Sequence, residues 1–292
     1  MEYKTKMNIN YFVRTKKFQP NFGYKIKTTE MTAIRPQIVF VHGMFVTNKC
    51  WKNWLPYFEG KGYECFAPAW PYKNDSPENL LKRHPDYKGE GNVHLKDVIT
   101  SFEKFIIELP QPPILIGHSM GALVVQLLLQ KGLGSCAVVI DSAPPQGVLS
   151  LEFSFLKANW PVLNPFMSKY KPCLWTEDQF CFAFADHLSG QELLNAFNDI
   201  VPQGKLVPRD SLKKIAKINY SKKQQPLLFI AGEKDKIIPA SLNQTNWSKY
   251  RKAPSKTDYK VFTGRRHNLI MDKGWDEIAE FISNWLGENR II

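Results

Sequence analysis

The residues best suited to chemistry lie in the run Gly117-His118-Ser119-Met120-Gly121, which has the form G-x-S-x-G. An apolar stretch, residues 113–116, precedes the run and an amphipathic segment, residues 122–131, follows it, so Ser119 is predicted on a strand-to-helix turn. A serine on so sharp a turn takes strained backbone angles and needs small neighbours, which explains the glycines. The helix that follows directs free N–H groups at the same point, where an oxyanion could form. Ser119 is therefore the candidate nucleophile.

A nucleophilic serine needs a general base and a group that orients this base. After a G-x-S-x-G turn, the acid and then the histidine are expected further along the chain. Residues 226–231 are typical of a buried strand, and Asp235 lies in the loop that follows them. Residues 259–262 are typical of a short strand, and His267 comes just past its end. His267 is therefore the candidate base and Asp235 the candidate acid.

Asp141 is a second candidate for the acid, because it too follows a buried strand, residues 138–140. The Gly-x-x-Asp turn at Asp235 and the proline at position 239 favour Asp235. Asp141 is then predicted to be a structural hydrogen-bonding residue.

Two more strands are predicted upstream of the serine, at residues 37–41 and 63–67, and the first leads into His42-Gly43-Met44-Phe45. Helical and strand periods alternate along this part of the chain, as a βαβ fold requires. Four patterns, H-G-x, G-H-S-M-G, G-x-x-D-x-x-x-P and a late G-x-x-H, occur in that order between residues 37 and 286. Together they resemble the α/β-hydrolase family.

The resemblance implies an α/β fold with an eight-stranded, mostly parallel sheet and helices on both faces. It also implies a triad of Ser119, His267 and Asp235, and an oxyanion hole from the backbone N–H groups of Met44 and Met120. In the implied mechanism, His267 takes the serine proton, an acyl-enzyme forms, and water activated by His267 releases the acid. No cofactor is expected, and no metal either, since no His/Asp/Glu cluster has ligand spacing.

An aromatic-rich segment interrupts the α/β alternation and resembles the helical cap of many family members. The cap is placed at residues 145–208 and the hydrolase core at residues 36–144 and 209–292. Most of its aromatic side chains are expected to form a small core of the cap itself. Four aromatic residues are predicted to contact substrate: Phe45, Trp160, Trp175 and Phe180.

The serine nucleophile favours acyl transfer over the haloalkane dehalogenases and epoxide hydrolases of this fold, which carry aspartate there. The aromatic cap indicates a bulky, hydrophobic ester or lactone as the small-molecule substrate. The sequences H-G-M-F-V-T, A-P-A-W-P and I-D-S-A-P-P resemble a subgroup of bacterial esterases, which we connect with esterases that open macrolide lactones and so with antibiotic resistance.

Three other functions remain open on the same fold. Cofactor-free haloperoxidases share the triad and use a small carboxylic acid to make peracid. Carbon–carbon bond hydrolases act on anionic dienoates, which Arg265 and Arg266 beside His267 could suit. A non-catalytic receptor could retain the triad without turnover.

Composition narrows the class of protein further. The chain has 292 residues, 43% of them hydrophobic, which suits one α/β domain with an inserted subdomain. No stretch approaches the roughly 20 apolar residues of a membrane span, and residues 1–10 lack the apolar region of a signal peptide. Five scattered cysteines suit reduced thiols, although Cys173 and Cys181 could pair. A cytoplasmic location is therefore expected.

The formal net charge of +12 raises the question of a polyanionic partner. Residues 1–35 hold eight Lys or Arg against two Glu, a net +6, so half the excess lies in a basic N-terminal extension. No basic helix or aromatic-basic module of a known type accompanies it, and nucleic-acid binding is not expected. The sequence gives no indication of oligomeric state.

Overall fold

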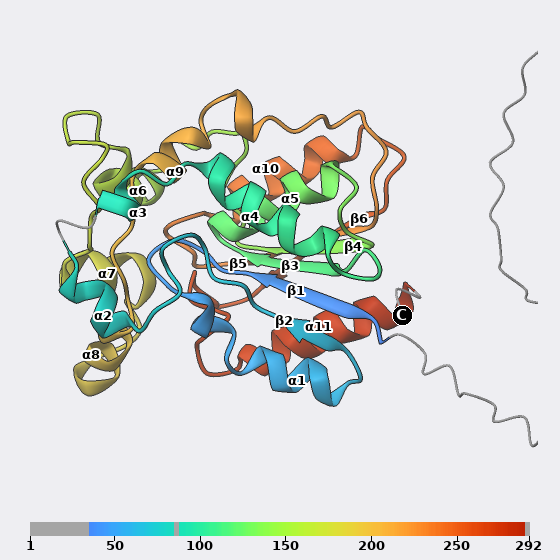
Figure 1. Ribbon diagram of the computed structural model, residues 1–292, viewed down its shortest axis with the longest axis horizontal. Coiled ribbons are helices and arrows are strands. Elements are labelled where there is room, and N and C mark those ends of the chain that lie inside the picture. Colours follow the sequence, from blue (N-terminus) through green and yellow to red (C-terminus); the bar gives the residue numbers. More distant parts are fainter. Residues whose placement is uncertain (1–34, 85–87, 290–292) are drawn as a thin grey trace, which may run out of the picture. The chain divides into compact units, whose positions relative to one another are not determined.

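A computed structural model describes residues 35–84 and 88–289, and its centre is one parallel sheet (Figure 1). The sheet is built from six strands: β1 (Gln37–Val41), β2 (Glu64–Phe66), β3 (Ile114–His118), β4 (Cys136–Ile140), β5 (Leu227–Gly232) and β6 (Thr257–Phe262). Their order is β2-β1-β3-β4-β5-β6, and all five pairings are parallel. The basic N-terminal extension lies outside the described residues, except for Arg35.

The expected strand count of eight is not met among the described residues, where the sheet has six strands and no antiparallel member. The number eight came from the family resemblance. The hydrophobic pattern of the chain itself predicts strands at six places, and all six form. The described part of the sheet starts at Gln37, and residues 1–34 ahead of it are not described.

Helices lie on both faces of the sheet. The described helices are α1 (Trp54–Gly60), α2 (Pro77–Lys82), α3 (Lys88–Gly91), α4 (Leu95–Ile107), α5 (Met120–Gln130), α6 (Phe153–Leu163), α7 (Glu177–Phe184), α8 (Gly190–Asn198), α9 (Leu206–Asp210), α10 (Ala240–Tyr250) and α11 (Trp275–Glu288), with the 3-10 turns η1 (Asn48–Trp51) and η2 (Lys214–Ala216). In Figure 1, α4, α5 and α10 lie above the sheet and α1 and α11 below it.

Strand residues alternate between two hydrophobic cores, one on each face. Val39 and Val41 of β1 pack in the core that contains α4 and α5, whereas Ile38 and Phe40 pack in the core that contains α1 and α11. All five residues of β1 are buried, as expected for a parallel strand covered on both faces. This arrangement fixes the strands whose carboxyl ends carry the candidate site.

The segment between β4 and β5 is fully described and contains α6 to α9, with no strand other than the isolated bridge between Cys173 and Gln203. Figure 1 shows α6, α7 and α8 beyond the carboxyl ends of the strands. The aromatic residues of this segment do not form a separate core as predicted. Phe155, Phe182 and Phe197 pack against the core on the α4–α5 face, which also contains Phe184, whereas Phe153, Trp160, Phe166 and Tyr170 are exposed.

All five cysteines are free thiols. Cys173 Sγ lies 3.6 Å from the Gln203 carbonyl oxygen and Cys181 Sγ lies 3.9 Å from that of Ala185, so the two cysteines do not pair. Within the described ranges, no helix has both the length and the apolar composition that crossing a membrane requires.

Candidate active site

Ser119 lies at the sharp turn between β3 and α5. Its φ angle is 58° and its ψ angle −124°, outside the regions that L-residues favour. The turn also requires glycine at position 121, because the end of β1 passes close to it. A Cβ atom on Gly121 would lie 2.3 Å from the carbonyl oxygens of Val41 and His42. The G-x-S-x-G prediction of a strand-to-helix turn is therefore confirmed in its geometry.

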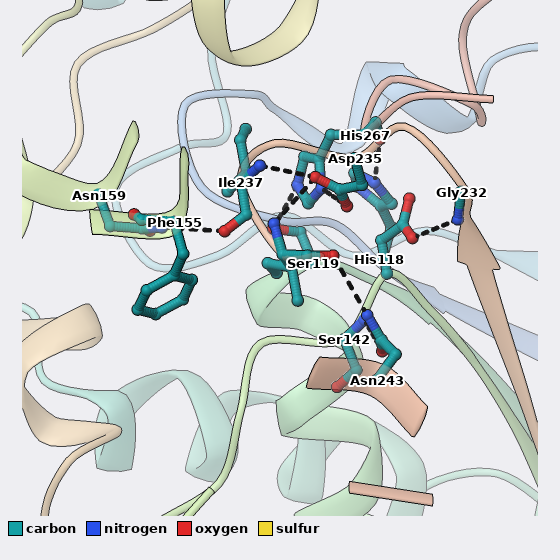
Figure 2. Close-up of polar contacts among 12 residues, drawn as sticks. His118, Ser119, Ser142, Phe155, Asn159, Gly232, Asp235, Ile237, Asn243 and His267 are labelled. Atoms are coloured by element: carbon teal, nitrogen blue, oxygen red, sulfur yellow. Dashed lines mark hydrogen bonds and ion pairs between the residues drawn. The ribbon is translucent and has the colours of Figure 1, made fainter. Parts of the chain in front are cut away.

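His267 lies between Ser119 and Asp235 and touches both (Figure 2). Its Nε2 atom is 2.9 Å from Ser119 Oγ, and its Nδ1 atom is 2.6 Å from Asp235 Oδ2. The side chains of His267 and Asp235 are completely buried. Because a carboxylate only accepts hydrogen bonds, Nδ1 carries the proton, and Nε2 is left to accept from the serine hydroxyl. The loops after β3, β5 and β6 thus bring a hydroxyl, a carboxylate and an imidazole into one chain of hydrogen bonds.

The loop after β5 holds the Asp235 carboxylate in place. Asp235 Oδ1 accepts the backbone N–H groups of Ile237 at 2.7 Å and Ile238 at 2.8 Å, which leaves Oδ2 for the imidazole. The Nδ2 group of Asn159, on α6, donates to the carbonyl of Ile237 at 3.0 Å (Figure 2). Helix α6 is therefore hydrogen-bonded to the loop that orients the acid.

Asp141, the rival acid, is also fully buried but bonds elsewhere. Its Oδ1 atom accepts the N–H of Gly232, the last residue of the neighbouring strand β5, at 2.8 Å. Burial, and then the neighbouring charge of Asp235, raise the pKa of Asp141 well above its ordinary value. No hydrogen bond joins Asp141 to His267 among the described residues. The structure thus places Asp235, not Asp141, against the imidazole.

The loop after β1 runs directly against the serine. A Cβ atom on Gly43 would lie 2.9 Å from Ser119 Cβ, so only glycine allows this approach. The amides of Met44 and Met120, predicted to form an oxyanion hole, donate to no other group among the described residues. Both N–H groups remain available to a ligand at this point.

His42 stabilises the same loop through two hydrogen bonds and a stacked ring. Its Nδ1–H donates to the carbonyl of Gly43 at 2.9 Å, its Nε2 accepts the N–H of Trp70 at 3.1 Å, and its ring stacks on the Trp70 indole. Burial, and then the nearby Lys73 charge, lower the pKa of His42 to about 3. The neutral imidazole is therefore a fixed structural support of the loop.

A buried polar cluster, missed by reasoning from the sequence, ties this loop to the segment before α9. Gln203 Oε1 accepts from the amide of Phe45 at 3.3 Å and from Lys73 Nζ at 2.9 Å, and the N–H of Val201 donates to the Phe45 carbonyl at 2.8 Å. Lys73 Nζ also lies 3.4 Å from Glu90 Oε1, with both side chains almost fully buried. No sequence motif signals these contacts, because those made by Gln203 and Val201 reach residues more than a hundred positions away.

A row of packed aromatic rings leads from the loop after β1 to the imidazole. The Phe45 and Trp175 rings stack with centroids 4.0 Å apart, and Trp175 meets Phe184 at 5.0 Å. Phe184 stacks on Phe180 at 5.7 Å and meets the His267 ring edge-on at 5.0 Å. Three of the predicted substrate contacts, Phe45, Trp175 and Phe180, belong to this row.

Two residues depart from the predicted set of contacts. Phe184 was not singled out, although it is the ring that touches His267; the aromatic density of the segment was the only available signal. Trp160 is 53% exposed on the outer side of α6 and does not line the cavity beside the site. The structure therefore does not bring Trp160 to the site.

A cavity of about 540 Å³ lies behind this row, between α7, α8, η1 and the segment after His267. Its apolar wall includes Phe180, Phe184, Leu188 and Ile200, and Asn268 also lines it. Ser119 does not line this cavity. Phe184 lines the cavity and also contacts the His267 ring, so this side chain connects the cavity wall with the imidazole.

One group of potential metal ligands occurs in the described residues, namely His118, Asp141 and His267, with ligand atoms within 4.8 Å of one another. Both ring nitrogens of His267 are engaged by Ser119 and Asp235, and His118 Nε2 donates to the His267 carbonyl at 2.8 Å. A cation here would have to break the hydrogen bonds that join the serine, imidazole and carboxylate. The donor set therefore does not fit a metal centre.

Comparisons with known proteins agree with this architecture. No curated protein matches the sequence. Among solved structures, polyneuridine aldehyde esterase is similar with a TM-score of 0.59 and 18% identity, covering 85% of this chain and 99% of that one. A monoacylglycerol lipase from Paleococcus ferrophilus gives a TM-score of 0.57 and 20% identity, covering 86% and 95%. Tomato methylketone synthase I gives 0.62 and 16%, covering 88% and 99%.

These structural likenesses establish the fold. A model of the alpha/beta hydrolase family matches residues 38–281, which is most of the chain and contains the six strands apart from Gln37, together with the Ser119 turn and the loops of Asp235 and His267. The chain belongs to the alpha/beta hydrolase family.

Proposed function

We propose that this protein is a serine hydrolase that cleaves a carboxylic ester or lactone through an acyl-enzyme. The observation that carries the proposal is the unbroken hydrogen-bonded chain from Ser119 Oγ through His267 to Asp235 Oδ2, at 2.9 and 2.6 Å. It begins at a serine whose backbone is held at a strained turn, as a nucleophile of this class requires.

In the proposed reaction, Ser119 Oγ attacks the carbonyl carbon while its proton passes to His267 Nε2. The carbonyl oxygen becomes an oxyanion and receives hydrogen bonds from the free amides of Met44 and Met120. The tetrahedral intermediate collapses, and the alcohol leaves with the proton from His267. Water then attacks the acyl-serine and gives a proton to Nε2. The second tetrahedral intermediate collapses, Ser119 Oγ takes that proton back from His267, and the carboxylic acid is released. Asp235 keeps the imidazole in the required tautomer throughout.

The surroundings of the serine support a substrate with a large apolar group. The aromatic row offers flat apolar surface next to the loop after β1, and the cavity beyond Phe184 has the size of a site for a small ligand. The Nε1–H of Trp175 is buried without a partner among the described residues and supplies one hydrogen-bond donor. We propose that the bulky part of the ester enters the cavity when Phe184 turns aside.

Cleavage of carbon–carbon bonds in anionic dienoates is less well supported. The two arginines beside His267 are already paired: Arg265 with Glu277 at 2.7 Å, and Arg266 with Asp186. Each guanidinium already has a carboxylate partner, which makes it less suited to bind a substrate carboxylate. Among the structural neighbours, the names polyneuridine aldehyde esterase and monoacylglycerol lipase agree with ester hydrolysis.

The test is a hydrolysis panel with wild type and Ser119→Ala, using p-nitrophenyl esters of increasing acyl length and macrolide lactones followed by mass spectrometry. We expect kcat/KM to rise with acyl length and to fall by several orders of magnitude in Ser119→Ala. A macrolide that gains the mass of one water, only with Ser119 present, would assign the lactone. Wild type and Ser119→Ala with equal rates on every ester would refute the proposal and direct attention to perhydrolysis or a receptor role.

A further inference from the structure

The described surface has an unusual concentration of apolar side chains around α6. Of the thirteen large hydrophobic side chains that are exposed among the described residues, eight lie between residues 149 and 170. They are Leu149, Leu151, Phe153, Leu156, Trp160, Phe166, Met167 and Tyr170. We call this set the α6 patch. Exposed apolar surface gathered in one place marks a contact surface, whereas single exposed residues do not.

The exposed apolar side chains of α6 all lie on one side of the helix. Phe153, Leu156 and Trp160 follow at i, i+3 and i+7, so all three project from one side of the helix. The buried residues Ala158 and Val162 lie on the other side. Phe153 is 76% exposed, and Phe166, shortly after the helix, is 91% exposed. The helix therefore presents one apolar face inward and a second apolar face to the outside.

The charges within the segment that carries the α6 patch are predominantly positive. Residues 145–172 contain three lysines, Lys157, Lys169 and Lys171, and a single acid, Glu152, a net charge of +2. The three lysines are exposed, and Glu152 is hydrogen-bonded to Ser241. Trp160 and Tyr170 add rings with one polar atom each, the type of side chain that favours the boundary between water and lipid.

We propose that the α6 patch docks the protein onto an anionic lipid surface. Apolar and aromatic side chains enter the headgroup boundary while the lysines meet negative headgroups, as in other interfacial helices. A second copy of the chain fits less well, because a symmetric contact would bring two segments of net +2 together in a protein of net charge +12. The charge of the surface complements lipid phosphate and opposes self-association.

Docking in this orientation has a consequence for the site, which rests on the proposed function. Asn159, on the inner side of α6, donates to the carbonyl of Ile237 in the loop that orients Asp235. A lipid surface held against the outer side of α6 would therefore lie one helix away from the Asp235 loop. Lipophilic esters dissolved in that surface would be presented within one helix of the loop that orients Asp235.

The test is cosedimentation of the full chain with vesicles of phosphatidylcholine alone and of phosphatidylcholine mixed with phosphatidylglycerol. The patch variant is Leu151→Ser/Phe153→Ser/Phe166→Ser. The matched control, Ile107→Ser/Leu212→Ser/Ile215→Ser, changes three exposed apolar residues outside the patch. We expect wild type and control to bind the mixed vesicles equally, and the patch variant to bind at least roughly tenfold more weakly. Matching circular dichroism melts would establish that both variants are folded.

A charge variant, Lys157→Gln/Lys169→Gln/Lys171→Gln, tests the electrostatic part. We expect its partition coefficient on mixed vesicles to fall about fivefold for each lysine at low salt, and wild-type binding to weaken as salt rises. Equal binding by wild type and the patch variant would overturn the proposal. So would a concentration-dependent dimer, measured by sedimentation velocity, that the patch variant abolishes while wild type ignores vesicles.

Ser119→Ala separates this inference from the proposed function. It should bind vesicles as wild type does, because docking requires no turnover. If esters are not hydrolysed but vesicles are bound, only the proposed function fails. If esters are hydrolysed and the patch variant binds vesicles as well as wild type, only the docking surface fails.

Discussion

Helices α5 and α6 have the same length, eleven residues, and both are rich in apolar side chains, yet they are buried to opposite extents. Ten residues of α5 are buried, against two of α6. Helix α5 packs between the sheet strands β1, β3 and β4 and helix α4, so every side of it meets protein. Helix α6 contacts α7 and α9 and leaves its other side open. Apolar composition alone therefore does not decide how deep a helix lies; the number of neighbouring elements does.

Asp235 is linked to both helices. It bonds to His267, which bonds to Ser119 directly before α5, and its loop bonds to α6. Asp235→Asn should lower kcat by roughly 10⁴-fold, because an amide at this position favours the wrong imidazole tautomer. Asp141→Asn should change kcat by less than about tenfold, since Asp141 bonds to Gly232 rather than to the imidazole. Single-turnover rates on a p-nitrophenyl ester measure both. The reverse ranking would move the acid to Asp141.

Matched truncations test the contrast between the helices directly. Leu128→Ala in α5 should lower the free energy of unfolding by about 2–5 kcal/mol, because Leu128 is fully buried and leaves a cavity. Phe153→Ala in α6 should change it by less than about 0.5 kcal/mol, although it removes a larger side chain. Urea denaturation gives both values. A loss at Phe153 as large as that at Leu128 would mean that the outer side of α6 is covered in the folded protein.

We expect the free energy of unfolding to depend on pH through buried histidines elsewhere in the fold rather than through α6, which contains no histidine. Folding lowers the pKa of His42 from 6.5 to about 3. Between these pH values His42 is protonated in the unfolded chain and neutral in the folded chain. Stability therefore decreases as pH drops below 6.5, by about 1.4 kcal/mol per unit for His42. His118, whose pKa is also lowered, acts in the same direction, and Asp141, whose pKa is raised, opposes it.

The variant His42→Gln isolates this contribution. Its glutamine oxygen can still accept the Trp70 N–H, but it cannot titrate. Urea midpoints from pH 7 to pH 5 should fall less steeply for the variant than for wild type. Parallel slopes would show that His42 is protonated in the folded state and would contradict the neutral imidazole.

Much of the sheet and of the candidate site could be predicted from the sequence, for local reasons. The strands follow short apolar runs bounded by turn residues, and the turn at Ser119 needs glycines at fixed positions. Because parallel strands end at one edge, the loops carrying Asp235 and His267 had to approach the serine. These signals lie within a few residues of the side chains that they position.

The parts that escaped prediction depend on contacts between distant segments. The Lys73–Glu90–Gln203 cluster joins three places that share no pattern, and its burial is visible only in the fold. Trp160 and Phe184 are both aromatic residues of the inserted segment, and nothing local distinguishes the exposed one from the ring against His267. The spacing of Phe153, Leu156 and Trp160 would equally suit a face turned toward the core.

The backbone angle of Ser119 has a consequence beyond catalysis. Every folded molecule carries the strain of φ = 58° at a residue with a Cβ, whether or not an ester is bound. Glycine would adopt this angle without strain, but it has no hydroxyl. Selection for thermal resistance and selection for turnover therefore pull in opposite directions at this position, and a search for more stable variants that ignores activity would favour replacing the serine by glycine.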